Sequence, residues 1–107
     1  MLKYGLRSKT LQQARQSVEK LLGLTFELRE SSFFGGDYLR AEVGEGTIYV
    51  QPNFDMLDNE PFEPSWPSNH FLLCLDGLED EKWERYIEHL ATLESSNDLV
   101  FLKRTTS

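Results

Sequence analysis

The side chains that could carry chemistry are few and are scattered along the sequence. The chain has two histidines, His70 and His89, and one cysteine, Cys74. Zinc sites of known type place His and Cys ligands in close pairs, and neither histidine has such a neighbour. Cys74 lies inside the apolar run 71–75 and has no second cysteine to pair with, so a buried thiol is expected rather than a nucleophile or a disulfide.

Other catalytic patterns are also missing from the sequence. It contains no G-x-S-x-G motif, no P-loop and no G-x-G-x-x-G motif. The pair Gly35 and Gly36 is expected to form a turn, because no helix follows it. Asp55, Asp58 and Glu60 could bind a hard cation, but the central glycine and terminal glutamate of a calcium loop are absent. We therefore predict a protein that is not an enzyme and that needs neither a metal nor another cofactor.

The segment with the most distinctive composition is residues 52–69, PNFDMLDNEPFEPSWPSN. It holds all four prolines and no basic residue, which disfavours a regular helix or strand. Loops this long are uncommon in compact domains and are often functional. Its carboxylates alternate with large apolar side chains, so that charge would speed the encounter with a partner and apolar anchors would slow dissociation.

This pattern predicts a partner-binding surface, and its candidate residues are Asp37, Tyr38, Phe54, Asp55, Asp58, Glu60, Phe62, Glu63 and Trp66. The same aromatic side chains could instead pack the loop onto the domain as a small core of its own, with the carboxylates merely solvated. The sequence leaves both interpretations open.

Hydrophobic spacing predicts the helices that position this loop. One apolar face is formed by Leu11, Ala14, Val18, Leu21 and Leu22. Thr10 and Gln13 form a capping-box pattern before this helix, and Gly23 is expected to end it. A second helix is expected to begin at residues 79–81, where acidic side chains suit the positive end of the helix dipole.

Alternation of apolar and polar residues predicts the strands. They are expected at residues 2–6, 24–29, 38–43, 47–51, 70–76 and 99–103. The order is (β)-α-β-β-β-long loop-β-α-β, which predicts an α+β fold with a mostly antiparallel sheet of five to six strands and two helices on one side.

Length and charge restrict the class of protein further. The chain has 107 residues, which fits a single domain, 1–107. It has 18 acidic and 11 basic residues and a net charge of −7, which opposes binding to nucleic acid or to an anionic membrane. No apolar run reaches the roughly 18 residues of a membrane span, and residues 1–10 lack a secretory signal, so we expect a cytoplasmic protein. A basic protein is the partner that this charge favours.

One resemblance raises an enzymatic alternative. EKLLGLTFELRE followed by YLRAEVGEGTIYV resembles, within residues 2–51, the β-α-β-β-β half-module of the glyoxalase and extradiol-dioxygenase superfamily. Enzymes of that superfamily hold a divalent metal with His, Gln or Glu from strands of paired modules. The resemblance implies a metal-dependent enzyme or small-molecule-binding protein acting as a dimer, with Gln51 and His70 as the conceivable ligands.

In size, acidity and organisation the whole chain resembles the immunity proteins that bacteria make against toxins of contact-dependent inhibition and polymorphic toxin systems. This resemblance implies a one-to-one complex with a cognate basic toxin, commonly a nuclease, whose active site the immunity protein covers. The carboxylates would then stand where substrate phosphates bind. A third hypothesis, a mimic of duplex nucleic acid, predicts acidic residues in a regular double row, which the clustering with aromatic residues disfavours. Whether the second acidic segment, residues 79–88, joins the interface is left open.

Overall fold

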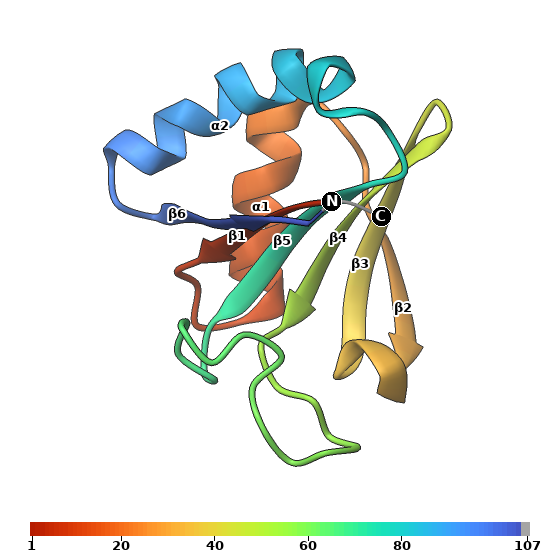
Figure 1. Ribbon diagram of the computed structural model, residues 1–107, viewed down its shortest axis with the longest axis vertical. Helices are drawn as coiled ribbons and strands as arrows, with labels where there is room; N and C mark the ends of the chain where they lie inside the picture. The colour runs from red at the N-terminus through yellow and green to blue at the C-terminus, as the bar shows by residue number, and fades with distance from the viewer. Residues whose placement is uncertain (106–107) are drawn as a thin grey trace.

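A six-stranded antiparallel sheet forms the centre of the computed structural model, which describes residues 1–105 (Figure 1). The strands are β1 (Leu2–Leu6), β2 (Glu27–Ser31), β3 (Gly36–Val43), β4 (Gly46–Pro52), β5 (Phe71–Asp76) and β6 (Leu99–Arg104). Their order across the sheet is β2-β3-β4-β5-β1-β6, and every neighbouring pair is antiparallel. The predicted α+β class and the predicted order of elements are confirmed.

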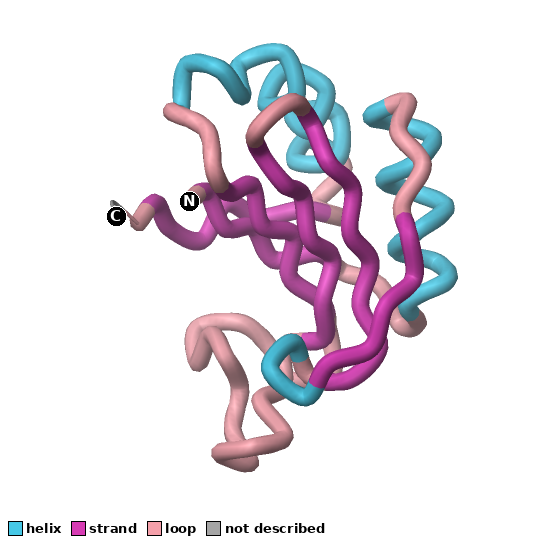
Figure 2. The backbone as a smooth tube through the Cα atoms, turned by 90° about the vertical axis from the view of Figure 1, so that its right-hand side faces the viewer, coloured by secondary structure: helices cyan, strands magenta, loops and turns pink. Residues whose placement is uncertain are grey.

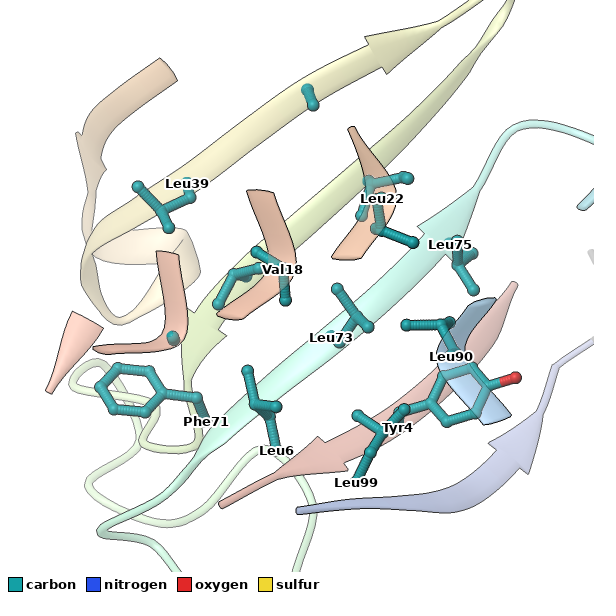
Figure 3. Close-up of a cluster of buried hydrophobic side chains, with 14 of the residues drawn as sticks. Tyr4, Leu6, Val18, Leu22, Leu39, Phe71, Leu73, Leu75, Leu90 and Leu99 are labelled. Carbon is teal, nitrogen blue, oxygen red and sulfur yellow. The ribbon is translucent and has the colours of Figure 1, made fainter. Parts of the chain in front are cut away.

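Two α-helices, α1 (Leu11–Leu22) and α2 (Glu84–Ser95), pack on one face of the sheet. The main core lies between them and the sheet, and Figure 3 shows how side chains from both layers meet there. Ala14, Val18 and Leu22 of α1 and Leu90 of α2 are buried against strand residues such as Leu73. This arrangement leaves the opposite face of the sheet free of α-helices (Figure 2). We call that second side the open face.

The ends of α1 follow the predicted signals. The Thr10 hydroxyl accepts a hydrogen bond from the Gln13 backbone N–H at 3.1 Å, and the Gln13 side chain accepts one from the Lys9 N–H at 3.0 Å. Gly23 ends the helix with φ of 67°, a left-handed conformation that glycine adopts without strain. The second helical segment is less regular than predicted, because a 3-10 turn, η2 (Asp80–Trp83), precedes α2.

Strand β2 begins later than the alternation predicts. Residue Phe26, expected within a strand, is bound to α1 instead: its N–H donates to the Glu19 carboxylate at 2.7 Å, and its carbonyl accepts from the Arg15 guanidinium at 2.7 Å. Pairing with β3 therefore starts only at Glu27. On this edge strand Leu28 is 55% exposed, although the alternation predicts it to be inside.

Strand β5 inserts between β4 and β1 and pairs with both. The order β-α-β-β-β is present in residues 2–51, but these residues do not form a continuous sheet by themselves. Where β1 begins and β6 ends, the N-terminal ammonium of Met1 donates to the Thr105 carbonyl at 2.8 Å. Residues 1 and 105 therefore lie side by side. Within residues 1–105 no helix is long and apolar enough to cross a membrane.

Candidate functional site

The long loop, residues 53–70, folds back under the open face of the sheet (Figure 2). A second apolar cluster forms there, with Trp66, Leu72 and Cys74 buried. Phe62 of the loop packs against the same cluster and is partly buried. The prolines prevent regular structure in the loop, yet its aromatic residues give it a core of its own.

Trp66 is the main apolar anchor of the loop. Its indole lies directly on Gly5 of β1, where any side chain larger than hydrogen would overlap the ring. The guanidinium of Arg7 lies 5.0 Å from the indole centroid, and the His70 ring lies at 5.7 Å. Only 6% of Trp66 is exposed. The ring therefore fixes the C-terminal part of the loop against the sheet.

Asn53 fixes the beginning of the loop with a set of buried hydrogen bonds. Its side-chain amide donates to the carbonyls of Trp66 at 2.7 Å and Glu63 at 3.0 Å. Its side-chain oxygen accepts from the Glu63 N–H at 2.8 Å, and its own N–H donates to the His70 carbonyl at 3.0 Å. One fully buried asparagine thus joins the two arms of the loop.

Glu63 supplies the electrostatic anchor. Its carboxylate forms an ion pair with the Lys103 ammonium on β6 at 2.6 Å, and the Glu63 side chain is 7% exposed. We predict Glu63 and Trp66 from the sequence as partner-binding residues, but in this structure both face the domain. Both residues hold the loop, because the open face of the sheet offers a surface that buries them, and their contact with a partner stays a prediction.

Beyond these anchors the chain makes a compact turn. The N–H of Asp55 donates to the Glu60 carbonyl at 2.7 Å, and the reverse bond measures 3.3 Å. The Asp55 side chain accepts from the N–H groups of Leu57 at 2.9 Å and Asp58 at 3.3 Å. The turn leaves Asp58 and Glu60 exposed, with Met56 at 50% and Leu57 at 59% exposure.

A second turn lies against this loop. It is the 3-10 turn η1 (Ser32–Phe34), whose capping Gly35 has φ of 84° and backs onto the Phe54 carbonyl so closely that a Cβ would stand 2.7 Å from the oxygen. Gly36 lies near the Met56 methyl group. Phe33 on η1 is 76% exposed. We call the resulting surface the acidic tip, and it comprises Phe33, Asp55, Met56, Leu57, Asp58 and Glu60.

The remaining predicted site residues lie behind the acidic tip. Tyr38 is buried to 7% exposure and stacks on Phe34, with centroids 4.4 Å apart, and its contact with a partner stays a prediction. Phe54 and Phe62 are half-buried. Asp58 and Glu60 are exposed on the tip, and Asp55 is partly exposed there. Asp37 is exposed on β3, where it lies near Leu11 and Arg15 of α1 rather than on the tip.

Three exposed apolar residues of the tip are missing from the predicted set: Phe33, Met56 and Leu57. A signal for Met56 and Leu57 was present, since they stand between two aspartates in a segment that must turn. Phe33 has a weaker signal, two consecutive phenylalanines before two glycines. The loop therefore has a packed base and an exposed tip, and the use of that tip as a partner-binding surface stays a prediction.

The residues implied by the enzymatic alternative lie apart from the acidic tip. Gln51 is buried on β4, and the His70 Nδ1 lies 3.5 Å from the Ser8 carbonyl beside Trp66. Burial raises the pKa of the Cys74 thiol to about 12. In the part of the chain that the structure describes, no three His, Cys, Asp or Glu side chains are grouped so that they could hold a metal ion.

Comparison with known proteins adds no relative: no family model, no curated protein sequence and no solved structure matches this chain. The geometry of the acidic tip is accordingly the observation that bears most directly on function.

Proposed function

We propose that this protein is an immunity protein, which binds a cognate basic toxin in a one-to-one complex and covers its active site, with the acidic tip as a contact surface. One observation carries the proposal. Exposed carboxylates and exposed apolar side chains alternate on a turn whose base is fixed by Asn53, Glu63 and Trp66. A nuclease toxin is the favoured target class, because its active site is built to bind phosphate oxygens and would attract carboxylates.

The charges of the tip are available to a partner. No salt bridge joins Asp55, Asp58 or Glu60 to any residue within 1–105, whereas Glu63 is neutralised by Lys103. Unpaired surface carboxylates raise the rate of encounter with a cationic protein, and salt screens that effect. The tip would therefore contribute mainly to the association rate.

The apolar side chains of the tip would contribute to the lifetime of the complex. Phe33, Met56 and Leu57 are each at least half exposed. Their apolar surface is therefore removed from water only when a partner binds over it. Methionine adapts to irregular partner surfaces because its chain is unbranched. Since the loop base is already fixed, little conformational entropy is lost on docking.

A gene beside the one for this chain is expected to encode a protein that ends in a small basic toxin domain, and the test uses that domain. Co-expression is expected to restore growth, and the purified proteins are expected to form a one-to-one complex. The proposal is wrong if the neighbouring toxin remains active in the presence of this protein.

Two matched pairs of substitutions then test the surface. Asp58→Asn with Glu60→Gln, and Glu84→Gln with Glu88→Gln on α2, each change the net charge from −7 to −5, because each removes two carboxylates. Figure 1 places α2 at the end of the molecule opposite the loop. At low salt the tip pair is expected to slow association about 3- to 10-fold, and the helix pair is expected to leave it unchanged. Equal effects of both pairs would assign the attraction to net charge rather than to the tip.

A matched pair of leucines tests the apolar contribution. Leu57 and Leu28 are exposed to 59% and 55%, but Leu28 lies on the edge strand β2. Leu57→Ser is expected to raise the dissociation rate, and Leu28→Ser is expected to leave it unchanged. If the two substitutions act alike, the tip is not the apolar anchor.

A further inference from the structure

A cavity of about 210 Å³ lies on the open face, between the sheet and the loop. Its walls are aromatic and come from three parts of the chain: Phe34 from η1, Tyr49 from β4 and Phe62 from the loop. The rings of Phe34 and Tyr49 stack with their centroids 5.0 Å apart. An apolar cavity of roughly 150 Å³ accommodates benzene, so this one has room for a single ring with a small substituent.

Gln51 gives the cavity a polar group. The residue lines the cavity and is only 8% exposed. Among residues 1–105 its side-chain amide has no hydrogen-bond partner, in contrast to Asn53, whose amide is fully used. The amide is not sealed from solvent, and it is free to bond an occupant, so an occupant that offers a donor or acceptor is favoured over a purely apolar one.

Two oppositely charged residues bear on the charge of the occupant. Lys3 on β1 and Asp76 on β5 both line the cavity, and Lys3 pairs in register with Cys74, two residues from Asp76. Their opposite charges favour neither an anionic nor a cationic occupant. A ring that is neutral and carries a dipolar group is the chemistry that matches both the aromatic walls and the amide.

We propose that this cavity receives one neutral aromatic ring with a hydrogen-bonding group, of the kind that tyrosine carries, from a side chain of the protein partner. This assignment of the ring to a partner rests on the proposed function. The position of the cavity supports this assignment, because its wall residues Phe62 and Phe34 belong to the same loop and turn that carry the acidic tip. The partner segment is therefore a tyrosine flanked by basic residues.

The ring is tested first with p-cresol and toluene, titrated into the full chain and followed by backbone amide chemical shifts. p-Cresol is expected to shift the amides of Gln51 and Cys74 and to bind more tightly than toluene. Gln51→Met keeps the length of the side chain and removes the amide, so it is expected to weaken p-cresol binding roughly 3- to 10-fold, the worth of one hydrogen bond, without weakening toluene. Absence of shifts at the cavity, or equal binding of the two compounds, overturns the proposal.

A second variant is included in case Gln51→Met disturbs folding. Phe62→Leu shortens one wall of the cavity and lies on the loop, outside the sheet. It is expected to weaken both compounds. Glu88→Gln on α2, outside the cavity and the tip, serves as the control and is expected to weaken neither. If Phe62→Leu folds, as amide spectra will show, and binds p-cresol as well as the original chain does, the cavity is not the binding site.

The origin of the ring is tested with two blocked tripeptides, acetyl-Lys-Tyr-Lys-amide and acetyl-Glu-Tyr-Glu-amide. The cationic peptide is expected to bind more tightly at low salt, and Asp58→Asn with Glu60→Gln is expected to reduce that preference. Equal binding of the peptides overturns the assignment to a cationic chain. Failure of toxin inhibition is measured separately by co-expression, so the two proposals can fail independently.

Discussion

Replacing Gly5 by alanine is expected to destabilise the protein through a single contact. Gly5 lies in β1, between β5 and β6, and its Cα faces the Trp66 indole. A methyl group there would overlap the ring and stand 2.8 Å from its Cε3 atom. Trp66 cannot move aside freely, because the loop that carries it is also held by Asn53 and Glu63.

The expected size follows from two opposing effects. Overpacking of this kind costs about 1–3 kcal/mol. In a strand, however, alanine is more stable than glycine by roughly 0.5–1 kcal/mol, because it loses less backbone entropy on folding. Once Trp66→Ala has removed the ring, Gly5→Ala should therefore stabilise the protein. The coupling energy between the two substitutions is expected to be about 1.5–4 kcal/mol.

Urea unfolding of the original chain, both single variants and the double variant measures this coupling. Far-UV circular dichroism is the appropriate signal, because fluorescence would lose the contribution of Trp66. Trp66→Ala alone is expected to cost about 3–5 kcal/mol. If Gly5→Ala costs the same free energy with and without the indole, the contact between Gly5 and Trp66 does not determine the choice of glycine.

Two further substitutions test the loop and the buried thiol. Asn53→Ala is expected to cost about 2–4 kcal/mol, because it leaves buried backbone groups of Glu63 and Trp66 without partners, and amide hydrogen exchange should rise in residues 53–70 more than in α1. The pKa of Cys74 is raised by burial from 9.0 to about 12, so its labelling by a thiol reagent at pH 8 should be limited by opening of the protein. The unfolded chain releases this proton at lower pH than the native one, so the free energy of unfolding should fall between pH 9 and 12. Cys74→Val should remove that component, and an unchanged pH profile would contradict the assignment.

Local signals in the sequence predicted most of the elements, because those signals act within a few residues. Thr10 and Gly23 bound α1 as their types require, and the alternation in residues 47–51 gives β4. Tertiary contacts overrode the local signal at Phe26, whose backbone groups are taken by Arg15 and Glu19 of α1. No pattern in the sequence indicates that β5 inserts between β4 and β1, since that pairing joins residues about 70 positions apart.

The candidate site was predicted as a segment but not residue by residue. Composition identified the loop, and Asp58 and Glu60 at its tip are exposed. Composition could not predict that Trp66 is buried against Gly5 of the sheet while Leu57 is exposed to solvent. That difference depends on which strand faces the loop, and it arises only once the sheet is assembled. Glu63 differs from Glu60 for the same reason, because only Glu63 lies within reach of Lys103.

The adjacency of residues 1 and 105 has a mechanical consequence. β1 and β6 are antiparallel neighbours, and Met1 and Thr105 are joined by two backbone hydrogen bonds at 2.8 and 2.9 Å. A force that separates these two residues would act along the hydrogen bonds and break them one after another, rather than shearing all of them at once. The protein should unfold at low force when it is pulled at residues 1 and 105. The same closeness would let a short linker join residues 1 and 105 in a circular permutant.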